Sequence, residues 1–409
     1  MARKDRLSGN EAVAEALRQI NPDVMAAFPI TPSTEIPQYF SKLVANGQVD
    51  SEFVPVESEH SAMSAVIGAE AAGARSVTAT SSAGMALMWE ELYLAASNRL
   101  PCGLTLVNRA LSGPININCD HSDSMGARDA GWIQIYAENN QEVYDNLVMA
   151  YRIGEHKDVR LPVMICQDGF ITSHAVENIE LLEDQAVRDF VGDYNPENYL
   201  LNPECPMAVG PYSVTNYYFE AKRAQAEALK HAKQVTLDVA TEYEKISGRK
   251  YGLFEEYKMD DAEFAVVIIG SAAGTTKEAV DQLRSQGNKV GVLKIRLFRP
   301  FPASEIAQSL KKCKAVAVMD RTESFNDNCG PLGAEVTTAL YRANADTLIL
   351  NYVYGLGGRD VRVCDMTKIY EELEKTAQKG VVEEPYRYMG VRESVSYTHL
   401  RAHETLRHL

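Results

Sequence analysis

Short apolar runs alternate with stretches of helical periodicity over residues 1–177. The strand-like runs are VMAAFPI (24–30), EFVPV (52–56), RSVTATSS (75–82), CGLTLVN (102–108) and LPVMICQD (161–168). Apolar residues between Ala12 and Ile20 recur at helical spacing, and Ser8 with Glu11 can form a capping box before them. Continuous apolar strands that alternate with helices predict an α/β domain with a mostly parallel sheet.

A second α/β domain is predicted over residues 261–393. Its strand-like runs are FAVVIIG (264–270), KVGVLKI (289–295), AVAVMD (315–320) and residues 348–353. Between the two domains, residues 178–260 begin with an Asn- and Pro-containing connection and continue as a charged helical stretch over 221–244, so we interpret them as a linker with a helical arm. Residues 394–409 resemble a translated sequencing adapter, and we expect a non-native tail there.

Charge and composition exclude several classes of protein. The 409 residues contain 41 Lys and Arg against 56 Asp and Glu, a net charge of −15, which disfavours general binding to nucleic acid or to an anionic membrane. The most apolar run, 264–269, is far shorter than the roughly 20 residues of a membrane-spanning helix. The basic N-terminus has no apolar segment behind it, so we expect no signal peptide and a cytoplasmic protein.

The seven cysteines are widely separated. They form no C-x-x-C pair and no group with the spacing of an iron–sulfur cluster, so we expect neither a cluster nor another metal on this chain. Most are expected to be buried thiols.

Four polar residues stand at or just beyond the ends of predicted strands in the first domain: Thr31, Glu59, Arg109 and Asp168. Ligands of open α/β sheets collect outside the carboxyl ends of the strands, so these side chains are candidates for one site. Each also has a structural interpretation. Thr31 can cap a helix that begins at Pro32, Glu59 can face a helix dipole, Arg109 can form a surface ion pair, and Asp168 can shape a loop.

Two glycine-rich segments do not qualify as nucleotide sites. GSAAGTTK (270–277) lacks the glycine that a Walker-type loop places directly before its lysine. GLGGRD (355–360) does not have the G-x-G-x-x-G spacing of a dinucleotide site.

Seven motifs, in order along the chain, resemble one family. They are FPITPSTEI (28–36), VESEH (56–60), TSSAGMALM (80–88), VNRALSGP (107–114), DHSDSMGARDAGWIQIYAENNQE (120–142), DGFITSH (168–174) and LFRPFP (297–302). Over residues 1–393 the chain resembles the α subunits of pyruvate:ferredoxin oxidoreductases, or pyruvate synthases. The resemblance implies a pyrimidine-side thiamine-diphosphate domain followed by a domain like the C-terminal domain of transketolase.

The resemblance also assigns roles to the strand-end residues. It places Glu59 beside the aminopyrimidine ring of thiamine diphosphate, where a carboxyl group assists deprotonation of the cofactor. It assigns Arg109 and Thr31 to the substrate, with the guanidinium group facing the carboxylate. The further cofactor contacts that it implies are Pro29, Ile30, Ser82 and Gly84. The loop 111–128 is expected to line the active site or a subunit contact through Asp120, His121, Asp123 and Arg128.

The resemblance implies a multi-subunit enzyme. It implies that a separate β subunit holds the cofactor's diphosphate and Mg²⁺, and the sequence agrees with this division, since a Gly-Asp-Gly motif followed downstream by Asn-Asn is absent. It also implies that a γ subunit and a ferredoxin-like δ subunit complete the complex, that iron–sulfur clusters on partner subunits carry the electrons to ferredoxin, and that coenzyme A is the co-substrate.

Three alternatives remain open on the sequence. A sister enzyme for 2-oxoisovalerate or 2-oxoglutarate shares the fold and the cofactor, although the string GWIQIYAENNQE (131–142) resembles the pyruvate branch. A non-catalytic scaffold subunit and a stand-alone transketolase-like enzyme are the other two.

Overall fold

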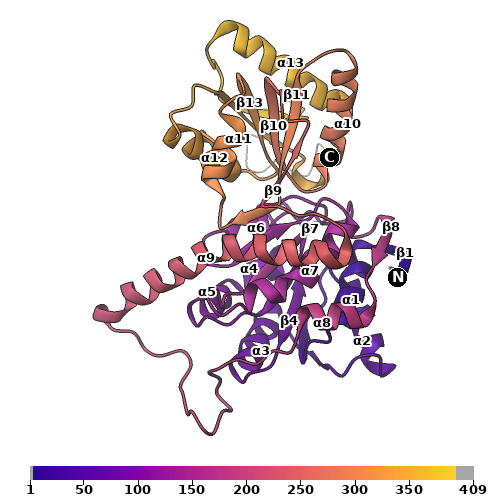
Figure 1. The fold of residues 1–409 in the computed structure, drawn as a ribbon, viewed down its shortest axis with the longest axis vertical. Helices are drawn as coiled ribbons and strands as arrows, with labels where there is room; N and C mark the ends of the chain where they lie inside the picture. Colours follow the sequence, from indigo (N-terminus) through magenta and orange to yellow (C-terminus); the bar gives the residue numbers. More distant parts are fainter. Residues whose placement is uncertain (1–2, 393–409) are drawn as a thin grey trace.

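The computed structural model describes residues 3–392, and it consists of two α/β lobes stacked end to end (Figure 1). The expected tail, 394–409, lies outside the described residues. The first lobe is built on a seven-stranded sheet. In sheet order its strands are β12 (Leu297–Arg299), β6 (Ile133–Tyr136), β7 (Val163–Asp168), β5 (Gly103–Asn108), β4 (Ser76–Thr80), β2 (Val24–Ala27) and β3 (Glu52–Pro55). Neighbouring strands are parallel except β12, which is antiparallel to β6. The predicted fold class is confirmed.

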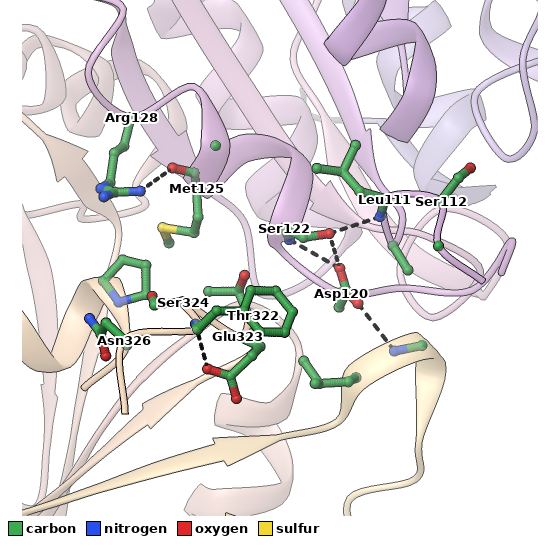
Figure 2. A pocket seen from close by; sticks show the side chains of 18 of the residues that line it. Leu111, Ser112, Asp120, Ser122, Met125, Arg128, Thr322, Glu323, Ser324 and Asn326 are labelled. Carbon is green, nitrogen blue, oxygen red and sulfur yellow. Dashed lines mark hydrogen bonds between the residues drawn. The ribbon is translucent and has the colours of Figure 1, made fainter. Parts of the chain in front are cut away.

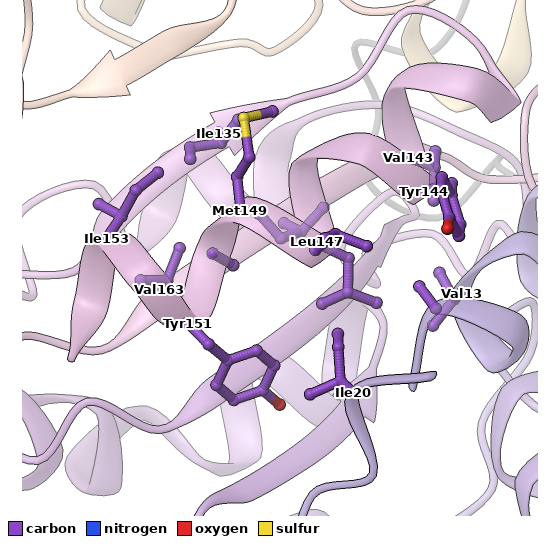
Figure 3. Packing of buried hydrophobic residues seen from close by; sticks show 14 of the residues in the cluster. Val13, Ile20, Ile135, Val143, Tyr144, Leu147, Met149, Tyr151, Ile153 and Val163 are labelled. Atoms are coloured by element: carbon purple, nitrogen blue, oxygen red, sulfur yellow. The ribbon is translucent and has the colours of Figure 1, made fainter. Parts of the chain in front are cut away.

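Helices cover both faces of the first sheet. One face packs against α1 (Gly9–Ile20), α2 (Glu35–Ala45), α7 (Asn140–Gly154) and α8 (Asp184–Val191), and the other against α3 (Glu59–Ala71), α4 (Ser82–Leu87), α5 (Trp89–Ser97) and α6 (Ser122–Gly126). Figure 3 shows α7 lying between the sheet and α1, with Leu147 among the apolar side chains of all three layers. The predicted capping box of Ser8 and Glu11 begins α1.

The second lobe has a six-stranded sheet. In sheet order its strands are β15 (Tyr386–Met389), β14 (Leu348–Tyr354), β13 (Ala315–Asp320), β10 (Phe264–Ile269), β11 (Val290–Ile295) and β9 (Phe254–Tyr257). Only β9 runs antiparallel to its neighbour. One face packs against α10 (Ala272–Ser285) and α13 (Val363–Lys379), and the other against α11 (Ala303–Leu310) and α12 (Pro331–Arg342).

Several elements differ from those that the pattern predicts. Part of the expected linker is ordered on the first lobe, because β8 (Val176–Leu181) pairs antiparallel with β1 (Arg3–Ser8). The helical arm is longer than 221–244: α9 (Thr215–Ser247) runs across the first lobe beneath the second (Figure 1). No described helix has the length and apolar character needed to span a membrane.

The helix expected to begin at Pro32 begins instead at Glu35. Residues 30–33 form a turn in which the amide and the hydroxyl of Ser33 both donate to the carbonyl oxygen of Ile30. Thr31 is therefore not a helix cap, and its exposed side chain is available for another role.

The carboxyl ends of the two parallel sheets face each other, and Asp168 joins them. This residue ends β7 and is 1% exposed. Its carboxylate accepts hydrogen bonds from Arg321 Nη1 at 2.9 Å and from the amide of Ser271 at 3.0 Å. Arg321 follows β13 and Ser271 follows β10, so both donors come from the second lobe. His121 Nε2 lies 2.8 Å from the same carboxylate. A side chain at Gly270 would place its Cβ 2.9 Å from both carboxylate oxygens, so the close approach requires glycine.

Asp168 is held in its charged form by these neighbours. Burial alone raises the pKa of a carboxyl group, but His121 and Arg321, with the hydroxyl of Ser271, hold the pKa of Asp168 well below its usual range. The lowered pKa means that this contact stabilises the folded chain at neutral pH.

Replacement of Asp168 by Asn tests this junction. The variant leaves the Arg321 guanidinium buried without its anion, so we expect the free energy of unfolding to fall by about 3–5 kcal/mol. The stabilisation by Asp168 is complete above its unfolded pKa of about 3.9 and is lost progressively as the pH falls from there through its much lower folded pKa, so the advantage of the wild type should begin to shrink below about pH 4. Urea unfolding at a series of pH values measures both effects.

The matched control is Asp184→Asn. Asp184 also pairs with an arginine, Arg18 at 2.6 Å, but its side chain is 39% exposed. We expect that loss to stay below about 1 kcal/mol. Equal losses in the two variants would contradict a special role for the junction.

Candidate active site

Arg109 and Thr31 are brought together at the carboxyl edge of the first sheet. Arg109 follows β5 and is 6% exposed. Its Nη1 donates to the carbonyl oxygen of Thr31 at 3.0 Å, and its Nε donates to the carbonyl oxygen of Asn116 at 3.1 Å. Within the described part of the chain, Nη2 has no hydrogen-bond partner and the guanidinium group has no carboxylate partner. The group is thus oriented by uncharged acceptors and keeps its positive charge available for an anion.

Glu59 lies at the same edge, in the first turn of α3, and is 5% exposed. Its carboxyl group makes no hydrogen bond or ion pair with any described residue. Gly84, on α4, faces it: a Cβ there would lie 2.6 Å from Glu59 Oε1 and 2.3 Å from Thr80 Oγ1. The Thr80 hydroxyl is also buried without a partner among the described residues. Buried polar groups are normally satisfied, so this pair fits a ligand that supplies the missing hydrogen bonds.

Asp123 joins the strand-end segments beneath the surface. Its carboxylate accepts from the amides of Ser82 at 3.0 Å and Arg109 at 2.9 Å, and from Asn108 Nδ2 at 2.8 Å and the amide of Ser124 at 2.7 Å. Burial raises the pKa of Asp123 to about 6, although the four N–H donors favour the charged form. The hydroxyl of Ser82 donates to Ala110, the residue after Arg109, so α4 and the Arg109 segment are tied together twice.

The loop that follows Arg109 forms one wall of a cleft between the lobes. The cleft has a volume of about 880 Å³ and is bounded on the other side by residues 322–326, Arg299 and the start of α12. Figure 2 shows Asp120 hydrogen-bonded to Ser122, and Arg128 donating to the carbonyl oxygen of Met125. The predicted loop 111–128 therefore has an inner layer, with Asp123, and an outer layer that faces the cleft.

The structure separates the predicted residues into three groups. Thr31 and Arg109 form one, Glu59 and Gly84 another, and Ser82 and Asp123 link the neighbouring segments. Pro29 is exposed and Ile30 partly exposed, directly before Thr31. Asp120 and Arg128 line the cleft. His121 belongs to none of these groups and does not line the cleft, because it is buried against Asp168 at the junction of the lobes.

The residues that sequence reasoning missed belong mainly to the second lobe. Ser271 and Arg321 directly follow apolar strands there, which is the same signal that singled out Thr31 and Arg109. Asn116 has no such signal, because its role depends on the path of an irregular loop.

Two groups of carboxylate, cysteine or histidine side chains are close enough to hold a metal among the described residues. They are Cys119 with His121 and Asp168, and Glu138 with Glu142 and Glu255. In both groups a basic side chain already neutralises the carboxylates: Arg321 in the first, and Lys294 with Lys277 in the second. This pairing disfavours a cation at either place.

Comparison with known proteins relates the chain to one family. Residues 15–241 match the family model described as pyruvate flavodoxin/ferredoxin oxidoreductase, thiamine diphosphate-binding, and residues 262–366 match pyruvate:ferredoxin oxidoreductase core domain II. Pyruvate synthase subunit PorA of Thermotoga maritima is 52% identical over 95% of this chain and 98% of its own. The PorA subunit of Methanocaldococcus jannaschii is 46% identical over 90% and 94%. Ketoisovalerate oxidoreductase subunit VorA of Pyrococcus abyssi is 43% identical over 92% and 95%.

Solved structures agree on the fold. The 2-oxoglutarate:ferredoxin oxidoreductase of Magnetococcus marinus superposes with a TM-score of 0.67 at 19% identity over 90% of this chain, which spans 65% of that protein's chain. A split-gene transketolase, an inactive β4 tetramer, superposes with a TM-score of 0.51 at 12% identity over 92% of this chain and 99% of its own.

Replacement of Asp123 by Asn tests the buried link. One carboxylate oxygen becomes an NH₂ group that faces two N–H donors, so two hydrogen bonds are lost in either orientation. We expect the free energy of unfolding to fall by about 2–4 kcal/mol, measured by urea or thermal unfolding. Asp129→Asn, directly after the loop and with a side chain that is 69% exposed, is the control and should change stability by less than about 0.5 kcal/mol. An unaltered stability of Asp123→Asn would argue against the link.

Proposed function

The chain belongs to the pyruvate:ferredoxin oxidoreductase family, and from this premise we propose that it is the α subunit of a pyruvate synthase. The assembled enzyme oxidises pyruvate: coenzyme A takes up the acetyl group as acetyl-CoA, CO₂ leaves, and two electrons pass to ferredoxin in a reversible reaction. The observation that carries the proposal is that one sheet edge holds both a buried carboxyl group, Glu59, and an arginine, Arg109, that have no charged partner among residues 3–392.

Glu59 fits the aminopyrimidine end of thiamine diphosphate. When bound, this cofactor supplies the nucleophilic carbon and the electron sink that decarboxylation of a 2-oxoacid requires. A carboxyl group can share a proton with a ring nitrogen, and Glu59 lacks any other partner among the described residues, so it would hold that proton on its carboxyl oxygen. Gly84 allows the carboxyl group to lie against α4, and Pro29, Ile30 and Ser82 stand on the neighbouring segments.

Arg109 fits the carboxylate of the substrate. A planar guanidinium group matches a planar carboxylate, and Nη2 is the nitrogen of Arg109 that remains without a hydrogen bond to the described residues. Thr31 supplies a hydroxyl donor next to it, since Arg109 Nη1 already binds the carbonyl oxygen of Thr31. Together the two residues bind and orient a small 2-oxoacid.

We further propose that a second polypeptide completes the site. The sequence has no Gly-Asp-Gly motif for the diphosphate and Mg²⁺, so a β subunit holds them. The exposed Pro29 and Thr31 are then placed at the contact between the subunits. A γ subunit and a ferredoxin-like δ subunit with iron–sulfur clusters take the electrons onward to ferredoxin, and the whole complex lies in the cytoplasm.

Substrate choice separates pyruvate from its nearest rivals. We expect the reconstituted complex to prefer pyruvate over 2-oxoisovalerate and 2-oxoglutarate in kcat/KM, measured as ferredoxin reduction in the presence of coenzyme A. A preference for 2-oxoisovalerate would instead identify the function of the VorA relative. Turnover by the isolated chain with thiamine diphosphate and Mg²⁺ would instead support the alternative of a stand-alone transketolase-like enzyme.

Glu59→Gln distinguishes a catalytic subunit from a scaffold. The amide cannot hold the proton in the same way, so we expect kcat of the assembled complex to fall by roughly 10²–10⁴-fold. The melting temperature of the variant chain should be no lower than that of the wild type, because the buried carboxyl group has no partner to lose among the described residues.

Glu57→Gln is the control, since Glu57 is exposed two residues before the same helix and accepts a hydrogen bond from Ser61. Its kcat should stay within about two-fold of the wild type. A full rate in the Glu59→Gln complex would remove Glu59 from the chemistry and favour the scaffold interpretation.

A further inference from the structure

A glycine-rich turn of the second lobe lies against the loop that follows Arg109. The turn is Gly355–Gly358, directly after β14, and it contains the GLGGRD segment that fits no nucleotide motif. Its glycines 355, 357 and 358 all have positive φ angles, of 63°, 58° and 79°. Backbone with these left-handed angles favours glycine, which has no Cβ to clash.

Three hydrogen bonds connect this turn to the loop. The amide of Gly357 donates to Asp120 Oδ2 at 3.3 Å, and its carbonyl oxygen accepts from Asn116 Nδ2 at 3.1 Å. The amide of Gly358 donates to the carbonyl oxygen of Cys119 at 2.7 Å. Figure 2 shows the bond to Asp120 at the wall of the cleft.

Asn116 faces the turn and Arg109 at the same time. Its carbonyl oxygen accepts from Arg109 Nε at 3.1 Å while its side chain donates to Gly357. The loop is also closed on itself, because Asn116 Oδ1 accepts from the amide of Asn118 at 2.7 Å and the carbonyl oxygen of Asn118 accepts from the amide of Ala110 at 3.0 Å. The position of the loop therefore fixes one of the two acceptors that orient the guanidinium group.

The fit between turn and loop leaves no room for a side chain. A Cβ at Gly357 would lie 2.5 Å from Asn116 Nδ2, and a Cβ at Gly358 would lie 2.5 Å from the Cβ of Asn118. The glycine turn is also anchored to the junction of the lobes, since Arg321 Nε donates to the carbonyl oxygen of Gly355 at 3.3 Å and Arg321 Nη1 binds Asp168. A chain of hydrogen bonds therefore connects Asp168, through Arg321 and the turn, to the loop that follows Arg109.

We propose that the turn Gly355–Gly358 positions Arg109, so that the second lobe sets the affinity of the first lobe for its anionic substrate. The proposal deepens the proposed function and rests on it for the identity of the substrate, a 2-oxoacid carboxylate. Arg109 has no ion pair within the described chain, and its orientation depends on the carbonyl groups of Thr31 and Asn116. Gly357, Gly358 and Asn116 are thus positioning residues, which act through Arg109.

Gly358→Ala in the reconstituted complex tests the proposal. The added methyl group displaces Asn118 and with it the loop, so we expect the KM for pyruvate to rise by roughly ten-fold, while kcat changes by less than about two-fold and the KM for coenzyme A is unchanged. Gly380→Ala is the matched control: Gly380 has a φ of 70° in the same lobe, but a Cβ there meets nothing within 4 Å. Equal KM values for pyruvate in the two variants would overturn the proposal.

A double-mutant cycle shows whether the effect passes through Arg109. In an Arg109→Ala complex, addition of Gly358→Ala should leave the KM for pyruvate unchanged within about two-fold, because the group that the turn positions is gone. If the two substitutions instead raise the KM for pyruvate independently, so that their fold-changes multiply in the double variant, the proposal is overturned. If Gly358→Ala does not assemble, Asn116→Ala removes the side-chain bond to Gly357 but keeps the carbonyl group that faces Arg109, and the same comparisons apply to it.

Hydrogen exchange separates failure of this proposal from failure of the proposed function. In the complex, Gly358→Ala should speed amide exchange in residues 110–120 relative to Gly380→Ala, whichever substrate the enzyme uses. If the wild-type complex does not oxidise pyruvate but the two variants differ in exchange, the proposed function is wrong and the positioning role stands. If the wild-type complex oxidises pyruvate and the two variants exchange equally, only the positioning role is wrong.

Discussion

The buried carboxylate of Asp168 is the contact on which the arrangement of the molecule depends. The two mostly parallel sheets face each other there with the carboxyl ends of their strands. Polar backbone groups and charged side chains gather at these strand ends. Arg321, Ser271 and His121 all reach this one anion from different segments. Because the anion and the guanidinium group are both removed from water, neither can be left alone without a large energetic cost, and the two lobes keep one relative placement.

That placement explains how the candidate site can be assembled from distant segments. Glu59 comes after β3, Arg109 after β5, and Thr31 after β2, so one sheet edge brings together residues up to 78 positions apart. Asp123 then fixes the backbone of the Ser82 and Arg109 segments with four N–H donors. At this edge the side chains of Glu59, Thr80 and Arg109 keep polar groups that have no hydrogen-bond partner among the described residues, and a cofactor and a substrate carboxylate are proposed to bind there.

The sequence predicted the parallel strands well because their apolar character is continuous: the runs at 264–269 and 315–320 are β10 and β13 themselves. It predicted Thr31, Glu59, Arg109 and Asp168 as candidates for one site because strand ends converge; the first three lie at one sheet edge, whereas Asp168 is buried at the junction of the lobes. It missed β6 and β12, which are short, and the pairing of β1 with β8, whose partners are more than 160 residues apart along the chain. It also missed the turn Gly355–Gly358 as a partner of Asn116, since a contact between two irregular segments leaves no periodic signal.

The short strand β12 makes the two lobes share one sheet. Its residues come from the chain of the second lobe, yet they pair with β6 at the edge of the first sheet, and Phe298 packs edge-on against Tyr136 with ring centroids 6.2 Å apart. The same apolar cluster continues from Trp132 to Ile306 across the boundary. A cut in the connection around α9 would therefore not release two independent folding units: excision of either lobe would expose a sheet edge and half of an apolar core. The molecule therefore has two sheets, but its lobes depend on each other and should unfold together as one cooperative unit.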